Sequence, residues 1–160
     1  MRKSIDLGLH DQDGWPNPKE LEHYFLGPQR EYWDPESRSD AAALWAKGVH
    51  GTEHLDVGKG RIDIELLIWR NPDFGVLLIY SKWGGPYKEM FSSKGDLSRL
   101  RDFVRAAHGT LLPIGLFVPF GAAWKAVKEF IETDGELPKS IEWIANQDLP
   151  PGTFPDPHEY

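Results

Sequence analysis

Residues 119–144, PFGAAWKAVKEFIETDGELPKSIEWI, constrain the fold most strongly because they combine a clear helical pattern with clear stop signals. The apolar side chains recur at helical spacing and form one broad stripe opposite a charged face: Ala123, Trp124, Val127, Phe130 and Ile131. Pro119 suits a helix start, since its missing N–H costs nothing there. Gly135 favours the left-handed geometry that ends a helix, and Pro138 prevents the helix from resuming. The stretch predicts a core helix.

A short strand is predicted directly after this helix, at residues 140–144. Alternation places Ile141 and Trp143 on one face of that strand. Because the strand follows the helix closely, we expect Trp143 to be buried against the apolar stripe, next to Trp124, Val127 and Ile131.

Three further strands are predicted in the middle of the chain. Residues 61–70 (RIDIELLIWR) alternate apolar and polar side chains with period two, which indicates a strand with one buried face. Residues 74–81 form a continuous apolar run that is typical of a central strand. Residues 87–93 return after a Gly-Gly-Pro turn at 84–86. Together these segments predict an antiparallel meander.

The remaining segments have weaker patterns. Residues 96–107 are open to two interpretations, since Leu97, Leu100, Phe103 and Val104 also have helical spacing. We favour a short helical turn at 96–100, followed by a hairpin in which 103–106 pairs with a return strand at 110–118. Toward the N-terminus, residues 19–26 predict a short helix. Residues 39–47 are open to two interpretations, a two-turn helix or an irregular segment.

These segments predict the α+β class, with an antiparallel β-sheet (meander plus hairpin), one main C-terminal helix packed on it and short N-terminal helices. A chain of 160 residues is typical of a single domain. Within it, residues 1–50 form an N-terminal elaboration, and 145–160 form a proline-rich tail that we expect to be loop or partly disordered.

The charge distribution narrows the class of partner. The formal net charge is −7, whereas nucleic-acid-binding proteins are usually basic, so we expect no nucleic-acid partner and electrostatic steering toward basic partners. Residues 129–160 carry eight acidic side chains against one basic one, Lys139. Such unevenness also occurs on surfaces that are merely solvated, so this second interpretation stays open.

Compartment and membrane association follow from composition. The chain contains no cysteine, which favours a reducing cytoplasm, and no apolar run that approaches the length of a membrane span. The first fifteen residues lack the sustained apolar region of a signal peptide. We expect a cytoplasmic protein.

One literal motif matches a catalytic pattern. His50, Glu53 and His54 have the H-x-x-E-H spacing of inverted zinc proteases, which requires all three side chains on one helical face. Glycines at 48 and 51 disfavour such a helix. We therefore expect exposed loop histidines and no catalytic zinc. No other catalytic or cofactor-binding set of residues is recognisable, so neither an enzyme nor a cofactor is predicted.

Several short motifs are similar to those of immunity-protein family 1 of bacterial polymorphic toxin systems. The C-terminal motif comprises Glu129-Phe130-Ile131, Thr133, Gly135, Pro138, Ile141 and Trp143. Upstream of it lie a core strand at Val76–Tyr80, the motif Phe91–Gly95, a hairpin from Phe103-Val104 through Gly109 to Pro113, and Val118-Pro119. The resemblance covers roughly residues 55–145, and the first ~50 residues match no family pattern.

The resemblance implies an antitoxin that binds a cognate toxin domain, a nucleic-acid deaminase or nuclease, and blocks its active site. Exposed aromatic and acidic side chains are the candidate contacts: Trp83, Tyr87 and Glu89 at the meander edge, and Glu132, Asp134, Glu136 and Glu142 in the C-terminal region. We expect a monomer. The alternatives are a small adaptor domain with another ligand, or a zinc-dependent hydrolase that uses His50, Glu53 and His54.

Overall fold

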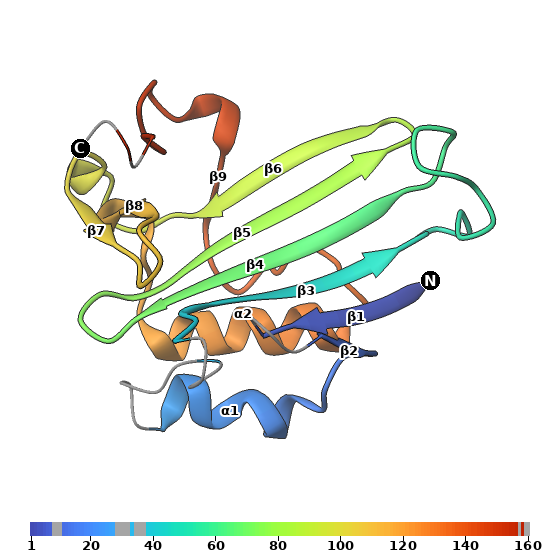
Figure 1. The fold of residues 1–160 in the computed structure, drawn as a ribbon, viewed down its shortest axis with the longest axis horizontal. Coiled ribbons are helices and arrows are strands. Elements are labelled where there is room, and N and C mark those ends of the chain that lie inside the picture. The colour runs from blue at the N-terminus through green and yellow to red at the C-terminus, as the bar shows by residue number, and fades with distance from the viewer. Residues whose placement is uncertain (8–10, 28–32, 34–37, 157, 159–160) are drawn as a thin grey trace.

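The computed structural model describes residues 1–7, 11–27, 33, 38–156 and 158. These residues form a seven-stranded antiparallel sheet in the order β2-β1-β3-β4-β5-β6-β9, two α-helices on one face of the sheet, and a separate β7–β8 hairpin (Figure 1). The strands are β1 (Arg2–Asp6), β2 (Asp11–Asp13), β3 (Ala41–Lys47), β4 (Asp63–Asn71), β5 (Gly75–Gly84), β6 (Tyr87–Ser93), β7 (Phe103–Arg105), β8 (Leu111–Pro113) and β9 (Trp143–Ala145). The helices are α1 (Pro18–Leu26) and α2 (Phe120–Glu132), and short 3-10 turns occur at Leu97–Arg99, Ile114–Leu116 and Asn146–Asp148. The predicted α+β class is confirmed.

Helix α2 is the predicted core helix. Its apolar stripe is buried, with Ala123, Val127 and Phe130 fully covered. The helix ends as its sequence predicts: Asp134 and Gly135 adopt positive φ angles, and the Gly135 N–H donates to the Phe130 carbonyl at 2.8 Å. Neither α-helix in the described part of the chain is long and apolar enough to span a membrane.

The predicted meander is confirmed as β4, β5 and β6. Alternating side chains of β4 point toward the helices, which buries Ile64, Leu66 and Ile68. Strand β5 is buried on both faces in its first half, where Leu77 and Leu78 are fully covered. Its continuous apolar run therefore reflects a central strand packed on both sides.

The β7–β8 hairpin covers the second face of the sheet over part of its length only. Its side chains pack with those from the first half of β5 in a small second core that includes Leu77, Leu112, Leu116 and Phe117. The hairpin is confirmed, but its return strand is shorter than predicted, because a 3-10 turn at Ile114–Leu116 follows β8 directly. In the described part of the chain, neither a helix nor the hairpin lies over the other half of this sheet face.

The N-terminal region differs from the prediction. Residues 41–47 form strand β3, so both the two-turn helix and the irregular segment were wrong. The alanines favour a helix by only about 0.5 kcal/mol each over typical residues. As a strand, the segment pairs with β1 on one side and β4 on the other and buries Ala42, Leu44 and Ala46 beneath the helices. These long-range contacts outweigh the local preference. Among the described N-terminal residues, α1 is the one predicted helix that forms.

Strand β9 forms close to its predicted place but at the edge of the sheet, where it pairs with β6 (Figure 1). Trp143 packs against the main core that includes Trp124 and Val127, but it remains half-buried, so the prediction that it is buried was wrong. Its indole N–H donates to the Pro138 carbonyl at 2.7 Å. The tail that follows is mainly loop, as predicted, but Ser92 and Asn146 join it to β6 through a side-chain hydrogen bond of 2.6 Å.

Candidate functional site

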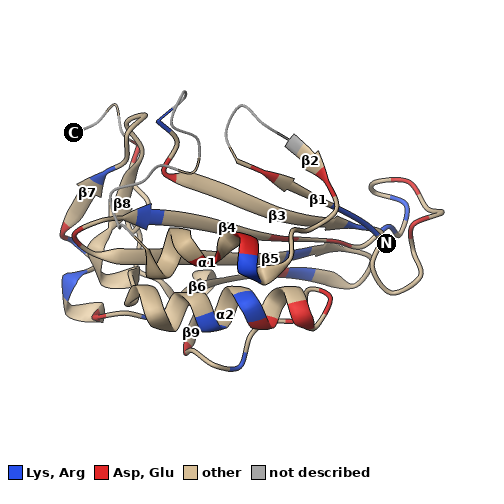
Figure 2. Ribbon diagram, turned by 90° about the horizontal axis from the view of Figure 1, so that it is seen from below, with Lys and Arg blue, Asp and Glu red and all other residues tan. Residues whose placement is uncertain are grey.

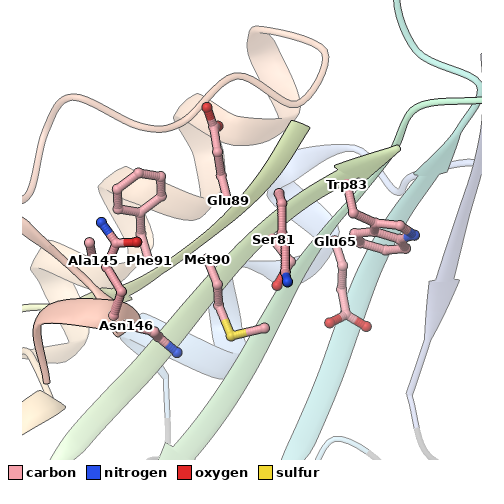
Figure 3. A pocket seen from close by; sticks show the side chains of 10 residues that line it. Glu65, Ser81, Trp83, Glu89, Met90, Phe91, Ala145 and Asn146 are labelled. Carbon is pink, nitrogen blue, oxygen red and sulfur yellow. The ribbon is translucent and has the colours of Figure 1, made fainter. Parts of the chain in front are cut away.

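The uncovered half of the sheet presents a continuous surface, which we call the open face. Strand register places one row of side chains across six strands on this side: Asp13, Ser4, Trp45, Glu65, Ser81 and Met90. Trp83, two residues after Ser81 on β5, belongs to the same face. In Figure 3 Glu65 and Met90 extend to one side of the sheet, whereas Glu89 and Phe91 extend to the other.

The described residues line two hollows on the open face. The larger has a volume of about 690 Å³ and is bordered by β4, β5, β6 and the start of the tail. Glu65, Ser81, Trp83 and Met90 line it, with Asn146 at its wall (Figure 3). A second hollow of about 480 Å³ lies over β1, β2 and β3. Its lining residues are Ser4, Ile5, Asp6, Gln12, Asp13, Trp45 and Lys47.

Two tryptophans connect these hollows. The rings of Trp45 on β3 and Trp83 on β5 meet edge to face, with centroids 6.2 Å apart. Both rings are half-buried, so part of each faces solvent. Glu65 on β4 stands directly opposite Trp45 in the strand register.

The Glu65 carboxylate is in an unfavourable environment for a charge. Its side chain is half-buried among the neighbouring strands, and burial raises its pKa above the ordinary value, with a further contribution from the negative charge of Asp6. Within the described residues no lysine or arginine forms an ion pair with it. A partner that supplied a cation here would relieve this unfavourable charge.

The meander-edge residues predicted from sequence separate onto two faces. Trp83 lines the larger hollow of the open face. Tyr87 is on the helix side, where the Lys82 ammonium lies 3.9 Å from its ring centroid and the His50 ring lies 6.0 Å away. Glu89 borders the larger hollow and also a smaller one on the helix side.

This smaller hollow, the helix-side hollow, has a volume of about 220 Å³ and is lined by Val49, His50, Ile64, Tyr80, Lys82, Glu89, Asp134, Gly135, Glu136 and Leu137. It brings together Glu89 from the meander edge and two acidic residues that follow α2, Asp134 and Glu136. Figure 2 shows acidic residues gathered at this end of α2. Acidic residues of the two candidate surfaces, the meander edge and the region after α2, therefore lie around the same hollow.

Tyr80 is one of the residues that line the helix-side hollow. Its hydroxyl donates to the Gly135 carbonyl at 3.1 Å, which ties β5 to the turn after α2. Burial raises the pKa of Tyr80 to about 12, and the carboxylates of Glu89 and Glu136 add to this effect. Tyr80 therefore remains a neutral hydrogen-bond donor at physiological pH.

The other two acidic candidates lie outside this hollow. Glu132 is exposed in the last turn of α2, and Glu142 is exposed just before β9. Glu142 forms an ion pair with Lys94, whose Nζ lies 3.8 Å from the carboxylate. Neither residue is among the described residues that line the helix-side hollow.

Sequence reasoning missed Trp45, Glu65 and Met90. Trp45 was assigned to a helix or an irregular segment, which hid its place in the sheet. The sequence does indicate the position of Glu65, because the alternation in residues 61–70 places it on the strand face opposite to the buried isoleucines. Its neighbours on β3 and β6 depend on pairing between distant strands, which no local pattern reports.

The H-x-x-E-H motif does not form a helix. His50 and Gly51 have φ angles of +58° and +73°, and the segment consists of turns. The Glu53 carboxylate accepts a hydrogen bond from the N-terminal amine of Met1, which lowers the pKa of Glu53. No group of three metal-binding side chains is found among the described residues. The one-faced arrangement that a zinc protease requires is therefore absent from this part of the chain.

Comparison with known families gives one match. The model of a family described as "Immunity protein Imm1" matches residues 26–145, which is well over half of the chain. The match begins far upstream of residue 55, where the resemblance in the sequence motifs started, and it includes β3. Neither curated proteins nor solved structures yielded a match.

Proposed function

Because the chain belongs to the Imm1 family of immunity proteins, we propose that it protects the cell by binding a nucleic-acid-targeting toxin domain, a deaminase or nuclease, and covering its active site. An immunity protein acts as an inhibitor and not as an enzyme. The family match carries the role of an inhibitor, and we propose the class of toxin and the way in which it is inhibited.

Charge is the observation that carries this choice of toxin. A protein that acts on DNA or RNA needs a basic cleft for the phosphate backbone. The present chain has a net charge of −7. Three of its carboxylates, on Glu89, Asp134 and Glu136, line one hollow together with one lysine, Lys82, and Asp134 is paired with Lys3. An acidic surface of this kind complements a basic cleft and speeds the encounter between the two proteins.

The proposed contact surface includes the residues predicted from sequence. Trp83, Tyr87 and Glu89 supply aromatic and acidic groups from the meander edge, and Glu132, Asp134, Glu136 and Glu142 supply carboxylates after α2. Aromatic side chains are enriched among the residues that dominate binding energy, while exposed charges mainly set the association rate. A toxin of this class acts in the cytoplasm, so the proposed immunity protein is cytoplasmic. We also propose that it acts as a monomer.

Co-expression tests the proposal. The cognate toxin domain, to be sought among the genes next to the one for this chain, should kill cells when expressed alone and spare them when this protein is present. Purified protein should form a one-to-one complex with a catalytically inactive variant of that domain, and adding it should abolish cleavage or deamination of a nucleic-acid substrate.

The control and the contrary outcome are equally direct. An unrelated immunity protein of similar size and charge should give no protection. If the present protein gives no protection and no complex is recovered, the toxin-inhibitor proposal fails, and the adaptor alternative becomes the better one.

A further inference from the structure

We propose that the open face binds a basic segment of the toxin and that an arginine of this segment lies against Trp45, Trp83 and Glu65. This inference rests on the proposed function, because the partner is the toxin. It extends the contact around Trp83 over the open face, on the other side of the sheet from the helix-side hollow, and it assigns the chemistry of the group that is bound.

The first step concerns the aromatic rings. Arginine is the cation that packs best on tryptophan, because its guanidinium is planar and only weakly hydrated. The chain itself uses this type of contact: Lys3 lies over Trp15, and Arg70 lies beside the Trp33 ring. Among the described residues no lysine or arginine lies over Trp45 or Trp83. Their exposed ring surfaces are therefore available to a cation from outside.

The second step concerns the carboxylate. Glu65 stands directly opposite Trp45 and diagonally from Trp83, so the acid and both rings lie within reach of one bound side chain. A guanidinium in this position would stack on a ring and form a charge-assisted hydrogen bond to the Glu65 carboxylate. It would also compensate the charge that burial and Asp6 make unfavourable.

The third step concerns the surroundings, which favour a basic segment over a neutral one. The side chains on this face that line the two hollows include three carboxylates and two lysines among the described residues: Glu65, Asp6 and Asp13 against Lys88 and Lys47. Glu89 also borders the larger hollow, but its side chain extends to the helix side. The three carboxylates lie on β4, β1 and β2, so the negative charge is concentrated between Glu65 and the β2 edge of the face. Such complementarity attracts basic partners and disfavours acidic ones.

The fourth step concerns space and apolar contact. Binding sites for small groups usually have volumes of roughly 300–1,000 Å³, and the larger hollow, at about 690 Å³, falls within this range. Met90 at its edge is 49% exposed and offers a flexible apolar surface for the aliphatic part of an arginine side chain. The hollow thus has room for one side chain and its neighbours.

The experiment measures the affinity of the full chain for a catalytically inactive variant of the toxin domain from which it protects cells, by calorimetry or surface plasmon resonance. Glu65→Gln removes the charge and keeps the shape, and Trp83→Ala removes one ring. Each should raise Kd by at least about tenfold, mainly through faster dissociation. Trp83→Phe should retain more affinity than Trp83→Ala, because phenylalanine still presents an aromatic face.

The matched control is Glu22→Gln, which makes the same chemical change at an exposed site on α1, behind the sheet. It should leave Kd unchanged. Circular dichroism and urea unfolding establish that each variant is folded before binding is measured, and Glu65→Gln keeps the test interpretable if Trp83→Ala does not fold.

The possible failures can be told apart. If the wild-type protein forms no complex with the toxin domain, the proposed function fails and this inference fails with it. If the wild-type protein binds, but Glu65→Gln and the folded tryptophan variants bind equally well, the function stands and the open face is not the arginine site. Single arginine-to-alanine variants of the toxin complete the test. The variant that lacks the proposed arginine should bind the Glu65→Gln protein with the same affinity as the unmodified toxin domain does.

Discussion

At the scale of single residues, Glu65 is the position where stability and binding are expected to conflict. Folding half-buries its carboxylate without a cation among the described residues. Proteins often retain such locally unfavourable groups at functional sites, where a partner supplies the missing interaction.

We predict that Glu65→Gln raises the free energy of unfolding at pH 7. The pKa of Glu65 is raised in the folded state, so the folded form prefers the neutral acid. The stability that this group contributes is present below its ordinary pKa of 4.5 and is lost as the pH rises through the folded value. Urea unfolding at pH 7 and at pH 4 should show an advantage for the glutamine variant that shrinks at the lower pH. A variant less stable than the wild type at pH 7 would contradict this account.

Two tryptophans test how burial sets the cost of truncation. Trp124 is almost fully buried between α1 and α2, so Trp124→Ala should cost about 3–5 kcal/mol. Trp143 remains half-buried, so Trp143→Ala should cost less, about 1–3 kcal/mol, with part of the loss from its hydrogen bond to Pro138. Urea unfolding of both variants makes the comparison. Equal losses would mean that the ring of Trp143 contributes as much as a buried one.

At the scale of elements, the end of α2 links the core to the helix-side hollow. The turn at Asp134 and Gly135 directs the chain back toward β5, where the Tyr80 hydroxyl holds the Gly135 carbonyl. The same turn places Asp134 and Glu136 at the helix-side hollow. The geometry of one helix end therefore fixes the position of two candidate contact residues.

Two glycines of this helix region should respond to alanine in opposite directions. Gly135 has φ +95°, and a Cβ there would come within 2.0 Å of an Ile64 methyl carbon, so Gly135→Ala should destabilise by at least about 1 kcal/mol. Gly121 lies in the first turn of α2, where a Cβ would meet nothing within 4 Å. Gly121→Ala should therefore stabilise by about 0.5–1 kcal/mol. Thermal unfolding of both variants measures the two changes, and a stabilised Gly135→Ala variant would refute the role of the turn.

At the scale of the whole molecule, charge should control how fast the toxin is found. If the acidic surface steers the encounter, raising the salt concentration should slow association steeply and change dissociation less. Stopped-flow measurements with the inactive toxin domain separate the two rates. An association rate that is independent of salt would exclude electrostatic steering.

The position of the charge can be tested by comparing two variants that have the same net charge. Glu136→Lys and Glu142→Lys both shift the net charge by two units. Glu136 lines the helix-side hollow, whereas Glu142 is paired with Lys94 outside it. We expect Glu136→Lys to slow association more, by roughly tenfold at low salt. Equal effects would indicate that net charge alone matters and that the hollow does not face the toxin.

The sequence by itself determined α2, the β4–β6 meander and the β7–β8 hairpin, because their signals are local. A helical apolar stripe, period-two alternation and turn residues all act within a few positions along the chain. The family motifs were readable for the same reason, since they mark structural positions such as Gly135. Tyr87 and Glu89 were likewise identified as candidates from their position at a predicted turn.

The tertiary structure alone decided which face of the sheet stays open and which residues meet there. Residues 41–47 became β3 because β1 and β4 offered partners on both sides, a gain that no local preference reports. That pairing set Trp45 opposite Glu65, and the fold placed Glu89 beside Asp134 and Glu136. Side chains far apart in sequence become neighbours only when strand register and helix packing are fixed together, which is why the shape of both surfaces had to come from the fold.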